Sequence, residues 1–297
     1  MSIRSYLRTA FPVALMALLA APLLAQESSA PPRPGAITVT SSLDVVSSYL
    51  FRGIRQHATG VAIWPATNAN VAWHSSDTGL RGASLDIGTW NSLHTGDTGA
   101  DGPTGKLWYE SDFYTTVTLG VAHGIGLGAT YTAYTSPNNA YTTVKEIAVK
   151  VAVDDTAALG RAAMKPYALV AIEVDTAPGV GQADGGRRAG RYLELGVAPG
   201  RSWPRASITV PVKVGLSLAD YYERNVGNET TPVFEDSRFG FASVAGVVTV
   251  PLGVSTRFGT WNLRGGVEVQ RLGATTRAFN GGQRSRVITS GGIGLSY

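Results

Sequence analysis

The chain has 297 residues, of which 15% are charged, and it contains 36 glycines and no cysteine. A soluble domain averages about 25% charged residues and about 7% glycine, so this composition is unusual for one. Without cysteine, disulfides and thiolate metal sites are excluded, and a formal net charge of +4 with no lysine and arginine cluster among aromatics argues against a nucleic-acid partner.

The first 25 residues predict a secretory signal peptide. Two arginines precede an apolar run at residues 11–24, which ends near Ala25. A transmembrane anchor is the alternative, but the run is short for a span of about 20 residues and contains Pro12 and Pro22. We therefore place cleavage after about Ala25, and we expect residues 26–36, which are rich in proline, to form a flexible lead.

From residue 37 to residue 297 the chain is a series of segments in which apolar and polar residues alternate. Alternation bounded by turn residues predicts strands with one apolar and one polar face. About twelve strands are predicted, at residues 37–51, 61–73, 82–90, 106–121, 124–134, 144–153, 165–175, 190–198, 207–221, 239–252, 259–272 and 286–297. No apolar run of 18 residues follows the signal, so helical membrane spans are not expected.

Two strands show the apolar face clearly. In the first, one face is predicted to carry Leu43, Val45, Tyr49 and Phe51, and the other Ser42, Asp44, Ser48 and Arg52. In residues 207–221, one face carries Ile208, Val210, Val212, Val214, Leu216 and Leu218. Six aliphatic residues in a row cover roughly 20 Å at ~3.4 Å per residue, close to the ~25 Å apolar band of a membrane barrel.

The connections between the strands alternate in length. Short turns such as residues 122–124 and 253–257 alternate with longer loops such as residues 92–105 and 222–237. Outer-membrane barrels have short turns in the periplasm and longer loops outside. We therefore predict an all-β fold, a transmembrane antiparallel up-and-down β-barrel of about 12 strands over residues 37–297, in contact with the lipid of a Gram-negative outer membrane. An exported soluble β-sandwich is the alternative.

Aromatic residues are predicted to form an interfacial belt near the strand ends that adjoin the longer loops. The residues are Tyr49, Phe51, Trp64, Trp90, Trp108, Tyr109, Tyr134, Phe239 and Trp261. The alternative is that strands favour aromatic residues wherever they lie.

Three stretches, SSYLFRGIRQ, PATNANVAW and LDIGTWNS, resemble the opening of the TorF-like porin family of proteobacterial outer-membrane proteins. The matching residues are Ser48, Tyr49, Phe51, Arg52 and Gly53, then Pro65 and Ala66, then Gly88, Trp90 and Ser92. The family's aspartate between Ser48 and Tyr49 is missing here, and the resemblance covers about the first third of the mature chain. It implies an outer-membrane barrel. The final Tyr297 is similar to the C-terminal aromatic signal of such barrels, which implies the barrel assembly machinery as a partner.

A search for catalytic and binding motifs finds none. His57 and His94 are expected to be solvated in outer loops, with His74 and His123 beside periplasmic turns. No Gly-x-Ser-x-Gly motif occurs, and no Ser–His pair is apparent on neighbouring strands. The stretch at 100–107 lacks the residues of a phosphate loop. The sequence therefore predicts no enzyme activity, cofactor or metal.

The polar faces supply the candidate pore lining. The predicted inward residues are Asp44, Arg52, Asp86, Glu110, Asp112, Glu146, Lys150, Glu173, Lys213, Arg264 and Glu268, with Asp175 and Glu194 as further inward acids. Acids outnumber bases, and rings of carboxylates favour cations. The alternative is that these charges pair across strands.

Twelve strands imply a narrow lumen, partly occluded by a loop. The function predicted is that of a narrow porin for passive diffusion of ions or small polar solutes, with a possible cation preference. A non-conducting structural or surface-interaction barrel, which acts through its outer loops, is the alternative.

Overall fold

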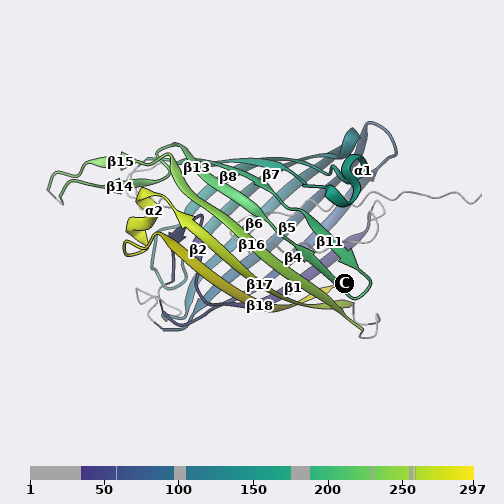
Figure 1. The fold of residues 1–297 in the computed structure, drawn as a ribbon, viewed down its shortest axis with the longest axis horizontal. Helices are drawn as coiled ribbons and strands as arrows, with labels where there is room; N and C mark the ends of the chain where they lie inside the picture. The colour runs from purple at the N-terminus through teal and green to yellow at the C-terminus, as the bar shows by residue number, and fades with distance from the viewer. Residues whose placement is uncertain are drawn as a thin grey trace, which may run out of the picture.

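In the computed structural model, twelve antiparallel strands close into a barrel (Figure 1). The structure describes residues 35–57, 59–96, 105–174, 188–228, 230–253, 257 and 259–297, so the predicted signal peptide, Asp175 and the stretch at 97–104 lie outside the described residues. The wall consists of β1 (Ile37–Val46), β4 (Ala62–Ser75), β5 (Leu80–His94), β6 (Trp108–Val121), β7 (Ile125–Thr135), β8 (Val144–Val153), β9 (Tyr167–Glu173), β10 (Arg191–Val197) with β11 (Gly200–Trp203), β12 (Ala206–Thr209) with β13 (Val212–Ala219), β16 (Phe239–Leu252), β17 (Thr260–Leu272) and β18 (Ser285–Ser296). Pairing of β18 with β1 closes the ring, which confirms the predicted fold class.

Two of the twelve strands are interrupted at prolines. The strand predicted at residues 207–221 divides into β12 and β13 around Pro211, and β10 is separated from β11 at Pro199. Proline has no N–H to donate to a strand ladder. The Val210 N–H donates to the Pro199 carbonyl at 2.8 Å, and the Ala245 N–H donates to the Pro211 carbonyl at 2.9 Å. The wall therefore stays continuous through both interruptions.

The aliphatic rows face outward, as the alternation predicts. Val149, Val212 and Leu218 are 51%, 38% and 53% exposed, whereas Glu146 and Ser217 on the opposite faces of the same strands are 1% and 5% exposed. A soluble barrel would arrange these faces the other way round. The barrel thus has an apolar outer face and a polar inner face, and its closure satisfies the backbone groups of the wall.

The two ends of the barrel differ in their connections (Figure 1). One end, called here the long-loop end, carries α2 (Ala274–Phe279) and the hairpin of β14 (Glu223–Asn225) and β15 (Phe234–Asp236), which projects beyond the wall. The other, called the short-turn end, carries the C-terminus and the short helical elements η1 (Ala122–Gly124), α1 (Thr156–Leu159) and η2 (Gly160–Ala162). Among the described residues, no helix is long and apolar enough to cross a membrane.

Strand β1 ends at Val46, and the chain then turns into the barrel instead of continuing to residue 51. Two short strands, β2 (Leu50–Phe51) and β3 (Ile54–Arg55), pair as a hairpin inside the wall. The turn residues Arg52 and Gly53 have φ values of 48° and 83°, and two positive values are typical of a type I′ turn. We call residues 47–57 the inward hairpin.

The prediction that Tyr49 and Phe51 lie on the lipid face is therefore wrong. Their side chains are 0% and 6% exposed, inside the barrel. Alternation does continue from Leu43 to Phe51 in the sequence, but the turn after Val46 changes which surface the alternating residues contact.

The predicted aromatic belt is also largely wrong. Six of its nine members are buried inside the barrel, namely Tyr49, Phe51, Trp64, Trp90, Tyr109 and Tyr134. The Tyr49 ring lies 5.3 Å from Trp64 and 5.4 Å from Trp90, centroid to centroid. Only Trp108 and Phe239 are exposed, at 38% and 39%, and Trp261 lies beside the short-turn end. Proximity to a strand end does not determine which face a side chain occupies.

Gly53→Ala is expected to destabilise the inward hairpin. An alanine there would hold a positive φ, at a cost of roughly 1–2 kcal/mol, and its Cβ would lie 3.1 Å from the Phe241 Cβ. Gly282→Ala is the matched control, because Gly282 has φ of 81° and no atom within 4 Å of the added Cβ. Amide hydrogen exchange of β2 and β3 measures the effect; equal exchange in the two variants would exclude the steric contribution of Phe241.

Candidate functional site

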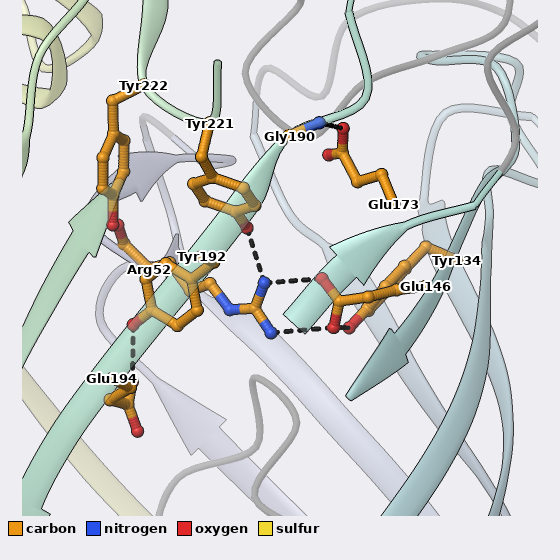
Figure 2. A network of polar contacts seen from close by, with 9 residues as sticks. All are labelled: Arg52, Tyr134, Glu146, Glu173, Gly190, Tyr192, Glu194, Tyr221 and Tyr222. Carbon is orange, nitrogen blue, oxygen red and sulfur yellow. Dashed lines mark hydrogen bonds and ion pairs between the residues drawn. The ribbon is translucent and has the colours of Figure 1, made fainter. Parts of the chain in front are cut away.

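The tip of the inward hairpin is fixed across the lumen by Arg52 (Figure 2). Its guanidinium donates to both carboxylate oxygens of Glu146 on β8, at 2.6 and 2.8 Å, and to the Tyr221 hydroxyl at 2.7 Å. The same guanidinium lies 4.1 Å from the centroid of the Tyr192 ring on β10. The hairpin tip is therefore attached to the opposite wall of the barrel.

The ion pair between Arg52 and Glu146 is deeply buried, with side chains 6% and 2% exposed. Burial opposes the charge of Arg52, but the Glu146 carboxylate and the Tyr221 hydroxyl both accept hydrogen bonds from its guanidinium. The Tyr134 hydroxyl also donates to Glu146 at 3.3 Å. A buried pair persists only when such hydrogen bonds complete it, and both partners here have them.

Side chains from the long-loop end hold the hairpin backbone. The Tyr222 hydroxyl donates to the Arg52 carbonyl at 2.9 Å, as Figure 2 shows. The Asn280 side-chain amide, just after α2, donates to the Gly53 carbonyl at 2.8 Å. The hairpin is thus fixed by segments from two connections at the long-loop end as well as by the wall.

The expectation that His57 and His94 are solvated is wrong, since they are 2% and 1% exposed. Their ring centroids are 4.6 Å apart, and His94 stacks on Tyr109 at 4.3 Å. The His57 Nε2 donates to the Thr95 carbonyl at 2.9 Å. These contacts attach the base of the inward hairpin to the end of β5.

A Ser–His pair, missed in the sequence, lies in the same cluster. The Ser92 Oγ and His94 Nε2 are 2.8 Å apart, and the Trp64 indole N–H donates to Ser92 at 2.9 Å. The prediction from sequence concerned pairs on neighbouring strands, whereas Ser92 and His94 are two residues apart on one strand and so share its inner face. Ser92 is 0% exposed, so the pair is enclosed by aromatic rings in this conformation.

All of the predicted pore-lining residues have side chains on the inner face, as judged from strand alternation and burial. Several are already paired. Asp44 and Arg264 form a salt bridge from β1 to β17, with one N–O contact at 2.6 Å. The Asn68 amide donates to Asp86 at 2.8 Å. Asp44 and Asp86 therefore each have a partner on another strand, an arginine in the first case and an amide in the second.

Glu194, a further inward acid, lies at the centre of a group on the opposite wall. It accepts hydrogen bonds from the hydroxyls of Tyr167 at 2.8 Å and Tyr192 at 2.7 Å. The Lys150 ammonium lies 4.4 Å from the centroid of the Tyr167 ring. Charged groups thus line the inner face over several neighbouring strands, while aliphatic residues cover the outer face.

The chain is an outer-membrane β-barrel. A closed wall leaves no unpaired strand edge in the hydrocarbon, and an apolar outer face with a polar lumen matches a bilayer outside and water inside. Within the described ranges, no group of three or more histidine, aspartate or glutamate side chains converges as a metal site would.

Comparison with known proteins returns barrels but no family. No family model matches the chain, and no curated protein matches its sequence. The COG4313 outer membrane channel from Pseudomonas putida F1 is 11% identical, over 90% of this chain and 97% of that one, with a TM-score of 0.49. The NanC porin is 13% identical, over 88% and 99%, with a TM-score of 0.39. The transport unit of the autotransporter AIDA-I from Escherichia coli is 11% identical, over 89% and 91%, with a TM-score of 0.40. None of these likenesses bears on the function of this barrel.

A cavity adjoins the inward hairpin on its short-turn side. It is partly open to solvent, and its walls come from the hairpin and from β4, β9, β10, β13, β16, β17 and β18. Arg52 and Glu194 border it. The lumen therefore contains a fixed hairpin with a cavity beside it.

Proposed function

We propose that this barrel is a narrow channel for passive diffusion of ions or small polar solutes, with the inward hairpin as its restriction. The main support for this proposal is the buried ion pair of Arg52 and Glu146, which joins the hairpin to the far wall. Replacement of such a pair by apolar residues is often neutral or stabilising. A barrel that served only as a scaffold would have no physical need for a charged lumen.

The inner face supports passage of polar solutes rather than lipid. Hydroxyls and charged groups follow one another along β6, β7 and β8, where Thr116, Thr118 and Thr132 are all buried on the inside. The Thr116 and Thr130 hydroxyls are 2.8 Å apart. A solute that lost its hydration shell in such a lumen would find hydrogen-bond partners in the wall.

The open channel is expected to prefer cations weakly. The inner-face residues named above comprise eight acids, Asp44, Asp86, Glu110, Asp112, Glu146, Glu173, Glu194 and Glu268, and four bases, Arg52, Lys150, Lys213 and Arg264. Displacement of the hairpin would move Arg52 away and increase the acidic excess. Because many of these charges are paired, the preference is expected to be small.

Planar bilayers with the purified, refolded protein test both parts of the proposal. We expect discrete conductance steps, and under a salt gradient a reversal potential displaced toward the equilibrium potential of the cation. A reversal potential displaced toward the anion would contradict the cation preference, and silent bilayers containing correctly folded barrel would contradict the channel.

A non-conducting barrel that acts through its outer loops is the second candidate. Two observations favour it, the hairpin that fills the long-loop end and the β14–β15 hairpin that projects beyond the wall. It predicts silence in bilayers even after the inward hairpin is released, which the variants discussed below can produce.

The resemblance to the TorF-like porin family is consistent with the proposal and involves the same residues. Phe51, Arg52 and Gly53, which carry part of the resemblance, form the tip of the inward hairpin. At the other end of the chain, Tyr297 is paired with Val39 by two backbone hydrogen bonds of 2.8 Å and is 75% exposed. We propose that this exposed aromatic is the feature that the assembly machinery recognises.

A further inference from the structure

The cavity beside the inward hairpin is lined by both apolar and charged side chains. Trp64, Phe241 and Ile288 border it and are 5%, 1% and 8% exposed. Lys213, Glu268 and Gln270 border it from β13 and β17. Ligand pockets commonly combine an apolar lining with a few polar groups. This cavity has that composition.

Lys213 supplies a positive charge that the barrel leaves without a direct partner. Among the described residues, no hydrogen bond or ion pair reaches its ammonium, which lies 5.6 Å from the centroid of the Phe241 ring. Glu194 and Glu268 are its carboxylate neighbours. Both carboxylate oxygens of Glu194 already accept tyrosine hydroxyls. The Lys213 ammonium is thus available to a carboxylate from a solute.

Glu268 and Gln270 supply hydrogen-bond acceptors in the same cavity. The Gln270 amide donates to one oxygen of Glu268 at 3.1 Å. Its own Oε1 is buried without a hydrogen-bond partner, and Gln270 is 3% exposed. A buried acceptor without a donor costs free energy, and an ammonium from a solute would satisfy both this oxygen and the charge of Glu268.

We propose that the cavity is a binding subsite for a small zwitterion of the amino-acid class with an apolar side chain. The carboxylate would bind Lys213, the ammonium would bind Glu268 and Gln270, and the side chain would pack against Phe241 and Trp64. A simple anion would meet the charge of Glu268, and a simple cation that of Lys213. Only a solute with both charges satisfies the two groups together, and this inference rests on the proposed passage of small solutes.

Calorimetric titration of the detergent-solubilised barrel with three probes tests the subsite. The probes are L-phenylalanine, 3-phenylpropanoate, which lacks the ammonium, and phenethylamine, which lacks the carboxylate. L-Phenylalanine is expected to bind saturably and about tenfold or more tightly than either analogue, since each lost interaction is a charge-assisted hydrogen bond. Binding of L-phenylalanine that is no tighter than that of both analogues would overturn the proposal, whatever the variants do.

Three variants test which residue of the cavity binds the carboxylate of the solute and which binds its ammonium. Lys213→Met is expected to remove the difference in affinity between L-phenylalanine and phenethylamine. Glu268→Gln is expected to remove the difference in affinity between L-phenylalanine and 3-phenylpropanoate. Lys150→Met removes a lumen lysine outside the cavity lining and is expected to leave both differences in affinity unchanged. Discrimination that survives in both Lys213→Met and Glu268→Gln would also overturn the assignment.

Conductance separates this inference from the proposed function. If the barrel conducts ions but binds the three probes equally, the proposed channel function stands and the proposed subsite is wrong. If the barrel binds L-phenylalanine more tightly than the analogues but never conducts, the proposed subsite stands and the proposed channel function is wrong.

Discussion

Val212→Arg is expected to lower the free energy of unfolding by about 2–4 kcal/mol, the cost of an arginine that faces lipid near the midplane of a barrel. Val212 is 38% exposed on the outer face, and it lies near the middle of the wall formed by β12 and β13. The arginine would have to leave water for hydrocarbon with no partner in the neighbouring strands. Urea titration of the protein refolded in lipid vesicles measures the loss.

Lys213→Ala is the matched control, one residue along and on the inner face. It removes a charge that no hydrogen bond holds among the described residues, so it is expected to fold as the unaltered protein does. If Val212→Arg were neutral and Lys213→Ala severely destabilising, the assignment of the two faces would be reversed.

Arg52→Met is expected to release the inward hairpin and to raise the conductance several-fold. The change leaves the Glu146 carboxylate buried without its cation, and loss of one partner from a buried pair costs about 3–5 kcal/mol. That cost shifts the balance between docked and released hairpin by roughly a hundredfold or more. Single-channel recordings measure the conductance, and hydrogen exchange of the Leu50 and Ile54 amides reports release of the hairpin.

A double variant separates the ion pair from the packing of the hairpin. Arg52→Met with Glu146→Leu replaces both charges by apolar groups, which is often close to neutral. The hairpin is then expected to stay docked, with low conductance and slow exchange. Arg52→Met with unaltered conductance and unaltered exchange would contradict the role of the ion pair.

The strands of the wall could be predicted because alternation and turn residues are local properties. In β12–β13, the residues predicted to face outward do so, and α2 and the β14–β15 hairpin, which belong to longer connections, lie at the same end of the barrel. The end of β1 could not be predicted in this way. Tyr49 and Phe51 continue the alternation of Leu43 and Val45, since β2 is itself a strand. The Arg52–Gly53 pair, whose glycine accommodates positive φ, was the available signal for a turn.

For the candidate site, the sequence predicts which face of a strand each side chain occupies, but it does not predict which side chains pair with each other. Strand alternation placed Glu146 and Arg52 on polar faces, but they are 94 residues apart, and no local pattern pairs them. The burial of His57 depends equally on the hairpin turning inward. Tyr192 and Tyr221 were not singled out at all, because tyrosine in a strand or loop has many ordinary explanations. Their hydroxyl and ring contacts with Arg52 appear only once the barrel has closed.

The hydrogen bond from Asn280 to Gly53 joins residues 227 positions apart, and Asn280 lies in the last connection of the chain. This contact cannot form until β17 and β18 have been added to the wall. The hairpin, although it comes early in the chain, therefore gains this one contact only after the last connection has been made, whereas its contacts with Glu146, Tyr221 and Tyr222 involve earlier segments. Contacts of such long sequence separation form slowly, so the contact between Asn280 and Gly53 is expected to be among the last to form as the protein folds.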